Sequence, residues 1–147
     1  MNFRLATLDD VPLLARMNRA LTEDEGHGNR TRSPAWFEER MRGFLSGGYG
    51  AGLFTRGEDV VAYALYKDHP EHADTIRVRQ LYVERDCRRQ GIGREVLGLL
   101  RDSILPAGKR ITVEVLATNL TARAFYRAVG FREYALELEW PAQEPSP

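Results

Sequence analysis

The sequence predicts a single domain of the α/β class. Stretches in which apolar residues recur at helical spacing follow stretches in which apolar and polar residues alternate. No internal repeat and no change of composition marks a second domain. A chain of 147 residues is also long enough to bury a core of its own. We therefore predict one domain over residues 1–140, followed by a proline-rich tail at 141–147 that is expected to fray.

The beginning of the chain is predicted to hold one strand and two helices. Residues 3–7 form the strand, and Asp9 or Asp10 then caps the first helix. Residues 22–32 are polar and contain two glycines, so they are predicted to be a loop. The second helix begins after Ser33, a favoured capping residue that a proline follows. Helical spacing marks the apolar faces of the two helices, at Leu14, Met17 and Leu21 and at Phe37, Met41, Phe44 and Leu45.

The rest of the chain is predicted to contain five more strands and two more helices, with turns between them. The strands are expected over 51–56, 59–67, 75–84 and 111–116, and a helix over 91–105. Asn119 caps the last helix, which ends at Gly130. Residues 132–140 are then predicted to form a final strand.

Charge and cysteine content exclude several classes of protein. Lys+Arg and Asp+Glu number 21 each, which argues against a nucleic-acid-binding protein because such proteins carry excess basic charge. One cysteine excludes an internal disulfide framework and suits a reducing compartment. The N-terminus lacks a leader pattern, and no apolar run approaches the ~18 residues of a membrane span. We therefore expect a soluble cytoplasmic protein without nucleic-acid or membrane partners.

A glycine-containing turn at residues 88–93 has the features of an anion site. It reads Arg-Arg-Gln-Gly-Ile-Gly, directly after a predicted strand and before a predicted helix. The first N–H groups of a helix have no acceptor within it, and the helix dipole adds partial positive charge. Gly91 and Gly93 lack a Cβ, so a large anion can approach the backbone closely. Because Arg85 and Arg94 flank the turn, its negative partner is expected to be a ligand, most simply a pyrophosphate.

The pattern Arg88-x-x-Gly91-x-Gly93 resembles motif A of the GNAT superfamily of acyl-CoA-dependent N-acyltransferases. A second segment resembles the next strand–helix unit of that family. It reads Glu-Val-Leu-Ala-Thr-Asn over 114–119 and continues through Phe-Tyr at 125–126 to Gly-Phe at 130–131. The resemblance covers roughly residues 76–131. It implies a mixed, mostly antiparallel sheet of about six or seven strands flanked by about four helices.

The resemblance also implies that acetyl-CoA is the acyl donor and that no metal takes part. The backbone of 88–94 is expected to hold the pyrophosphate, and the pantetheine arm is expected beside 78–84. In this family N–H groups near 81–83 stabilise the oxyanion, often beside a bulge that opens the strand pair. The donor-binding residues expected on this basis are Leu81, Tyr82, Val83, Arg88, Arg89, Gln90, Gly91, Ile92, Gly93, Arg94 and Asn119.

Acyl transfer to an amine needs a base and an acid. An alkyl amine has a pKa near ~10.4, so only about one molecule in ~2,500 is neutral at pH 7. Glu114 is the candidate base, since it is predicted to lie within a strand among apolar neighbours; the alternative is a glutamate on a solvated face or paired with an arginine. A GNAT branch that acetylates protein N-termini has a glutamate at this spacing from the tyrosine. Tyr126 matches the family's general-acid position and is expected to protonate the CoA thiolate; the alternative is a half-buried packing tyrosine.

The acceptor is predicted less directly. In the family the segment between the first two helices often lines the acceptor site. Here that segment carries Asp24, Glu25 and His27, whose acidic members are expected to attract a small cationic amine, although a charge run is also typical of a solvated loop. A protein N-terminal amine is the alternative acceptor, and a non-catalytic acyl-CoA-binding module is the alternative function. A homodimer is a mild expectation.

Overall fold

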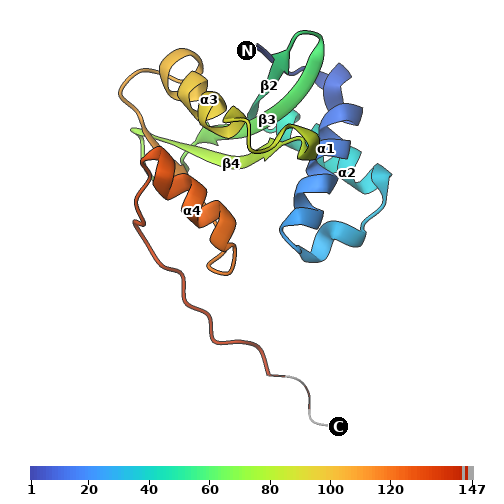
Figure 1. Ribbon diagram of the computed structural model, residues 1–147. Helices are drawn as coiled ribbons and strands as arrows, with labels where there is room; N and C mark the ends of the chain where they lie inside the picture. Colours follow the sequence, from blue (N-terminus) through green and yellow to red (C-terminus); the bar gives the residue numbers. More distant parts are fainter. Residues whose placement is uncertain (144, 146–147) are drawn as a thin grey trace. The chain divides into compact units, whose positions relative to one another are not determined.

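The computed structural model describes residues 1–143 and 145, and the chain divides into two compact units, residues 1–114 and 115–147. The first unit holds all the strands of the described residues and most of the helices (Figure 1). In chain order its elements are β1 (Asn2–Leu5), η1 (Leu8–Asp10), α1 (Val11–Asp24), η2 (Gly28–Thr31), α2 (Pro34–Ser46), β2 (Gly50–Arg56), β3 (Asp59–Asp68), β4 (Thr75–Val83), η3 (Arg85–Cys87), α3 (Ile92–Leu99), η4 (Leu100–Ile104) and β5 (Arg110–Val113).

The sheet is mixed and mostly antiparallel, as predicted. Its strands lie in the order β1-β2-β3-β4-β5, and only β4 and β5 are parallel. Parallel neighbours need a crossover connection, and α3 with η4 supplies it here. The described residues form five strands instead of the six to seven expected.

The strand predicted over residues 132–140 is wrong: this segment has no regular secondary structure. Its apolar side chains do alternate along the chain, and they are exposed, with Leu138 at 88% and Trp140 at 93%. Alternation alone does not make a strand, because a strand is stabilised only by a ladder of hydrogen bonds to a neighbour.

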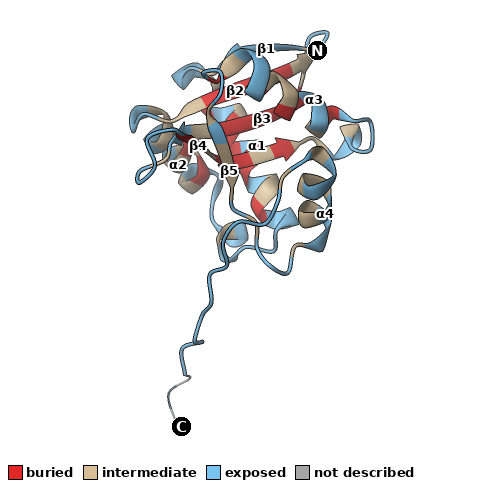
Figure 2. Ribbon diagram, turned by 90° about the vertical axis from the view of Figure 1, so that its left-hand side faces the viewer, coloured by how far each residue is buried: buried red, intermediate tan, exposed pale blue. Residues whose placement is uncertain are grey.

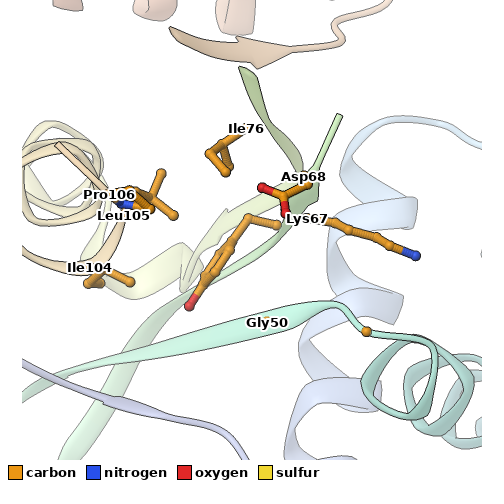
Figure 3. Close-up of a pocket in the computed structure, with 9 residues that line it drawn as sticks. Gly50, Lys67, Asp68, Ile76, Ile104, Leu105 and Pro106 are labelled. Atoms are coloured by element: carbon orange, nitrogen blue, oxygen red, sulfur yellow. The ribbon is translucent and has the colours of Figure 1, made fainter. Parts of the chain in front are cut away.

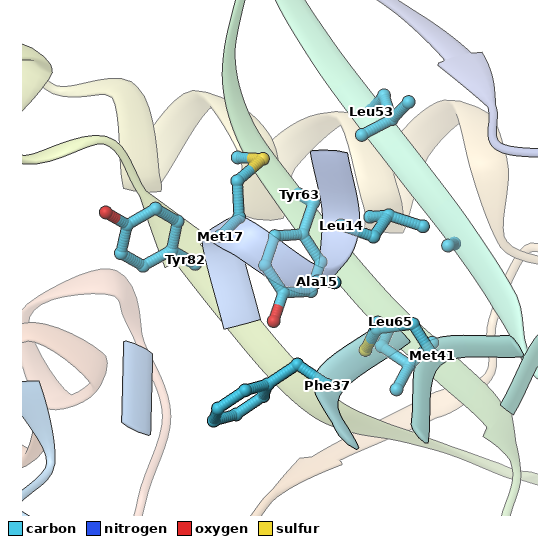
Figure 4. Close-up of a cluster of buried hydrophobic side chains, with 10 residues drawn as sticks. Leu14, Ala15, Met17, Phe37, Met41, Leu53, Tyr63, Leu65 and Tyr82 are labelled. Carbon is cyan, nitrogen blue, oxygen red and sulfur yellow. The ribbon is translucent and has the colours of Figure 1, made fainter. Parts of the chain in front are cut away.

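Helices cover both faces of the sheet within the first unit. α1 and α2 pack against one face, where Leu14, Met17, Phe37, Tyr63 and Tyr82 belong to one buried cluster (Figure 4). Side chains of a strand point alternately to opposite faces, so the neighbours of Tyr63 on β3 point toward the face that α3 covers (Figure 1). The strands β2, β3 and β4 are therefore buried on both sides (Figure 2).

A buried polar chain crosses the core from α1 to β4. Asn18 donates a hydrogen bond from Nδ2 to the Tyr63 hydroxyl at 3.1 Å, and that hydroxyl donates to Oε1 of Gln80 at 2.9 Å. Asn18 and Tyr63 are fully buried, and Gln80 is 8% exposed. Burial raises the pKa of Tyr63 far above its ordinary value, so the ring keeps its proton at any physiological pH. This chain links α1 to the middle of the strand that carries the predicted donor site.

We expect Tyr63→Phe to destabilise the first unit by about 1–3 kcal/mol. The change leaves Nδ2 of Asn18 and Oε1 of Gln80 buried without their shared partner. Urea denaturation followed by circular dichroism measures the loss. Tyr66→Phe on the same strand is the matched control, since no hydrogen bond is found between its half-buried hydroxyl and the described residues. Equal stability of the two variants would show that the hydrogen bonds of Tyr63 contribute nothing to the free energy of unfolding.

Several predicted helix boundaries are confirmed and others shift. Ser33 caps α2 by accepting the Trp36 N–H at 3.2 Å. α1 continues to Asp24, three residues into the predicted loop, because Thr22 is buried and its hydroxyl bonds to the Arg19 carbonyl at 2.8 Å. The helix predicted over 91–105 is α at first and becomes a π-turn in η4.

The second unit contains α4 (Leu120–Val129). Asn119 caps it, as predicted, by accepting the Ala122 N–H at 3.2 Å. Gly130 ends it at a φ of 120°, a conformation that side chains disfavour. Arg123 and Arg127 both pair with Glu133 just beyond the helix. No helix formed by the described residues is long and apolar enough to cross a membrane.

Candidate active site

A bulge interrupts β4 next to the predicted donor segment. Gln80 pairs with Leu65 on β3, but Val78 pairs with Tyr66, so Arg79 is an extra residue on β4. Bulges of this kind re-aim side chains and are frequent beside active sites. The resemblance placed the bulge near 81–83; it lies at Arg79 instead, two residues earlier.

The two parallel strands part directly before the bulge. Their ladder ends where Val78 pairs with Val113, whereas β4 continues to Val83. Within residues 1–114, the part of β4 from Arg79 to Val83 pairs with β3 only. The other edge of this segment, which we call the open edge, can therefore bind an extended ligand through its backbone.

The direction of the backbone groups along the open edge follows from one hydrogen bond. The N–H of Glu84 donates to the carbonyl of Val61 on the β3 side at 2.8 Å. Alternate residues of an antiparallel strand point their N–H groups to the same side, so that of Tyr82 also faces β3. The N–H groups of Leu81 and Val83 accordingly face the open edge, as an oxyanion or amide ligand there requires.

The turn after β4 forms the start of α3. Gly91 is its N-cap residue and has a φ of 75°, in the left-handed region where a Cβ is strained. The first bond of the helix runs from the Glu95 N–H to the Gly91 carbonyl at 3.1 Å. The N–H groups of Ile92 and Gly93 precede that bond and point out of the helix start. The turn therefore has the outward N–H groups at a helix N-terminus that the predicted anion site requires.

The arginines of the turn differ in what they contact. Arg88 turns back toward the protein: its Nε donates to the Val83 carbonyl at 3.1 Å and its Nη2 pairs with Asp24 at 2.5 Å. Its guanidinium also lies 5.5 Å from the centre of the Tyr82 ring. Arg89 has no ion pair or hydrogen bond with the described residues and a φ of 64°. Positive charge toward a ligand is therefore expected from the helix start and Arg89 more than from Arg88.

Gln90 is held by a neighbouring strand. Its Oε1 accepts a hydrogen bond from Nη1 of Arg56 at 3.1 Å, and Arg56 also pairs with Glu95 at 3.0 Å. The side chain of Gln90 thus fixes the turn against β2, which leaves its backbone to face a ligand.

The predicted acceptor residues have three different surroundings. Asp24 pairs with Arg88 and also with Arg85 at 3.0 Å, so its charge is already balanced. Glu25 has no ion pair with the described residues and keeps access to solvent, but the protein atoms around its carboxyl raise its pKa. His27 accepts the Asn29 N–H on its Nδ1 at 3.0 Å and thereby caps η2. Among these three residues, only Glu25 has a carboxylate that forms no ion pair with a described residue and could therefore contact an amine.

The candidate acid and base lie in different units. Glu114 is the last residue of the first unit and follows the end of β5, so it is not within a strand as predicted. Its side chain is 68% exposed and pairs with Arg77 at 2.6 Å. Tyr126 lies on α4 in the second unit, with its ring centre 5.3 Å from that of Phe131. Within the second unit, the ring contacts with Phe125 and Phe131 set the orientation of the tyrosine.

Comparison with known proteins identifies the family. A family model described as "Acetyltransferase (GNAT) family" matches residues 14–131, which is most of the chain and includes the bulge, the open edge and the helix start. The chain belongs to the GNAT acetyltransferase family. No curated protein sequence matches it.

Solved structures with the same fold support the assignment. A possible acetyltransferase from Clostridium difficile 630 matches with a TM-score of 0.76 at 18% identity, over 97% of this chain and 98% of that one. An acetyltransferase from Thermus thermophilus matches with a TM-score of 0.74 at 23% identity, over 90% and 88%. An aminoglycoside 6′-N-acetyltransferase from Acinetobacter haemolyticus matches with a TM-score of 0.73 at 14% identity, over 99% and 100%. These identities show a shared GNAT fold and no more.

The first unit also contains a small hollow of 240 Å³ (Figure 3). It is lined by the ends of β3 and of η4, including Tyr66, Lys67 and Ile104, and by none of the predicted site residues. Among the described residues, no three His, Cys, Asp or Glu side chains gather into a group that could hold a metal ion.

Two arginines that approach the ring of Phe44 were not predicted as site residues. Arg79 occupies the bulge, and Arg40 on α2 approaches the same aromatic ring, that of Phe44. The bulge leaves no signal in a single sequence, because pairing register depends on the partner strand. The spacing of Arg32, Trp36, Arg40 and Phe44 at four-residue intervals could have been noticed.

Proposed function

We propose that this GNAT protein transfers an acetyl group from acetyl-CoA to a small primary amine by direct attack in a ternary complex. The observation that carries the proposal is the open edge of β4, with the N–H groups of Leu81 and Val83 directed outward, followed directly by the Gly91 helix start. A backbone edge that leads into an anion site matches a ligand with a long amide-containing arm and a pyrophosphate.

In this proposal the two parts of the donor have separate binding sites. The N–H groups at the start of α3 bind the pyrophosphate. The pantetheine arm extends back along the open edge, which brings the thioester toward Leu81 and the bulge at Arg79. There an outward N–H group stabilises the oxyanion that forms when the amine attacks the thioester carbon. The C–S bond then breaks, and the thiolate needs a proton.

Calorimetric titration with acetyl-CoA tests the donor site. We expect micromolar binding for acetyl-CoA and binding at least about a hundredfold weaker for S-acetylpantetheine, since charge-assisted hydrogen bonds to the pyrophosphate are worth about 1.5–3 kcal/mol each. NAD, which has a pyrophosphate but no pantetheine arm, is the second control and should bind weakly. Failure of acetyl-CoA to bind would refute the proposed function.

Glu114 is proposed to collect the amine proton through water and Tyr126 to protonate the thiolate. Glu114 is exposed, so it can pass the proton to solvent, and Arg77 keeps its carboxylate in place. We expect Glu114→Gln to lower kcat about 10²-fold without weakening acetyl-CoA binding. Glu58→Gln in the β2–β3 turn is the control, and thiol release is the assay. An unchanged kcat would remove Glu114 from the mechanism and make Glu25, whose pKa is raised, the next candidate.

The proposed acceptor is a small molecule. Two solved structures of similar fold are aminoglycoside acetyltransferases, from Acinetobacter haemolyticus and from a soil metagenome, and aminoglycosides are small amines. Attraction of a cationic group in this chain would depend on Glu25, because Asp24 is neutralised by two arginines.

A further inference from the structure

Cations and aromatic rings alternate in a continuous row that runs from α2 across to β4 and β3. Each cation lies within 5.9 Å of a ring centre, and each of the two arginines in the middle lies beside two rings. We call this the basic–aromatic row; its members in spatial order are Arg32, Trp36, Arg40, Phe44, Arg79, Tyr49 and Lys67.

None of the four cations in the row forms an ion pair with any residue that the structure describes. Several cations elsewhere in the first unit do, such as Arg16 with Glu84 and Arg77 with Glu114. Lys67 donates only to the Gly47 carbonyl, and Arg79 donates to the Tyr49 hydroxyl at 3.3 Å. The row is therefore a band of uncompensated positive charge in a chain with zero net charge.

The two central arginines of the row lie beside the same aromatic ring. Arg40 lies 5.4 Å and Arg79 lies 5.1 Å from the centre of the Phe44 ring. Burial lowers the pKa of Arg40, and the charge of Arg79 lowers it further, which means that the two cations repel each other. The charge of Glu25 opposes this lowering of the pKa, but Glu25 makes no ion pair with Arg40.

One atom of this pair lacks any partner. Nη1 of Arg40 is buried and has no hydrogen bond among the described residues. A buried guanidinium N–H without an acceptor is costly, and contact with aromatic faces compensates only part of the cost. An anion contacted by both guanidinium groups beside the Phe44 ring would supply an acceptor and reduce the repulsion, because guanidinium groups bind carboxylate and phosphate oxygens in charge-assisted pairs.

The position of the pair connects it to the proposed reaction. Arg79 is the bulge residue, two positions before Leu81, whose N–H faces the open edge. The pair lies on the face that α1 and α2 cover, since Phe44 belongs to α2. The pyrophosphate site at α3 is at the other end of the open edge, so the pair is located to meet the acceptor and not the donor phosphates.

We propose that Arg40 and Arg79 form a subsite for an anionic group, carboxylate or phosphate, carried by the acceptor amine. The inference rests on the proposed function and deepens it, because it changes the expected acceptor from a simple cationic amine to an amine that also bears an anion. Amino acids and amine phosphates are the two chemical sources of such a molecule.

Matched acceptors test the subsite. An amino acid is compared with its amide, and phosphoethanolamine with ethanolamine, by kcat/KM for thiol release at saturating acetyl-CoA. We expect the wild type to prefer the anionic member of one pair by about tenfold or more, and Arg79→Gln to abolish most of that preference. Which pair shows the effect identifies the anion. Arg101→Gln is the control, as this arginine of η4 pairs only with the adjacent Asp102.

Different outcomes would contradict the subsite and the proposed function. Acetyl-CoA binding and turnover with no preference for anionic acceptors, or an equal preference in wild type and Arg79→Gln, would overturn the subsite while leaving the proposed function standing. Lack of acetyl-CoA binding would overturn the proposed function itself. In that case calorimetric binding of the same anionic amines to wild type and Arg79→Gln still tests the subsite. Arg40→Gln is the second variant, accepted only if its melting temperature stays near that of the wild type.

Discussion

We expect Tyr126→Phe to lower kcat by about 10²–10⁴-fold while acetyl-CoA binds as tightly as in the wild type. The change removes only the phenolic oxygen that is proposed to protonate the CoA thiolate. The ring remains and keeps its contacts with Phe125 and Phe131, so α4 should fold normally. Calorimetry measures donor binding, and thiol release measures turnover.

Tyr134→Phe is the matched control for this experiment, because Tyr134 is a 70% exposed tyrosine of the same unit. It should retain full turnover. If Tyr126→Phe also retained turnover, the tyrosine would be a packing residue and the thiolate would leave without an acid. If it instead lost acetyl-CoA binding, its role would lie in holding the donor.

The second large effect is expected at the helix start. Gly91→Ala should weaken acetyl-CoA binding by about tenfold or more and destabilise the fold by about 1–2 kcal/mol, which is the usual strain of a side chain in the left-handed region. Gly91 has a φ of 75° and open space where a Cβ would be, so the strain comes from the backbone and not from a clash. Relief of that strain would turn the N–H groups of Ile92 and Gly93 away from the pyrophosphate.

Gly98→Ala in the same helix is the control. Its Cβ would also meet open space, and its φ is not positive, so the change should be neutral or slightly stabilising for a helix residue. Calorimetric Kd values and urea midpoints for both variants complete the comparison. A Gly91→Ala protein that is destabilised but binds acetyl-CoA normally would show that the glycine serves the turn alone.

The ion pair between Asp24 and Arg88 connects two segments that are distant in the sequence. It joins the end of α1 to the residue that leads into the helix start, and Arg85 strengthens the same connection. Arg88 therefore mainly holds these two segments together. The segment next to the predicted acceptor loop is thus tied directly to the donor turn, although 64 positions separate the two residues.

Features that depend on a few neighbouring residues could be predicted from the sequence. The caps at Ser33 and Asn119 and the glycine end of α4 follow from local hydrogen bonding or from the lack of a Cβ. The order of the elements in the first unit and the family also followed from such signals.

Pairing between distant residues could not be predicted. The alternating segment at 132–140 looks like a strand, yet a strand pattern specifies neither a partner nor a register. The bulge at Arg79 arises because β3 and β4 pair out of step by one residue. Glu114 pairs with Arg77, which lies on β4 and is 37 positions away in the sequence.

The sequence by itself determined the GNAT family and the glycine-containing turn that begins α3, because a helix start and its capping glycine depend on neighbouring residues. Only the tertiary structure decided which charges remain available to a ligand. Arg88 and Arg77 are neutralised by acids far away in the chain, whereas Arg40 and Arg79 lie against aromatic rings and form no ion pair with an acid in the part of the chain that the structure describes. A charge is balanced by what lies beside it in space, and the fold brings those neighbours together.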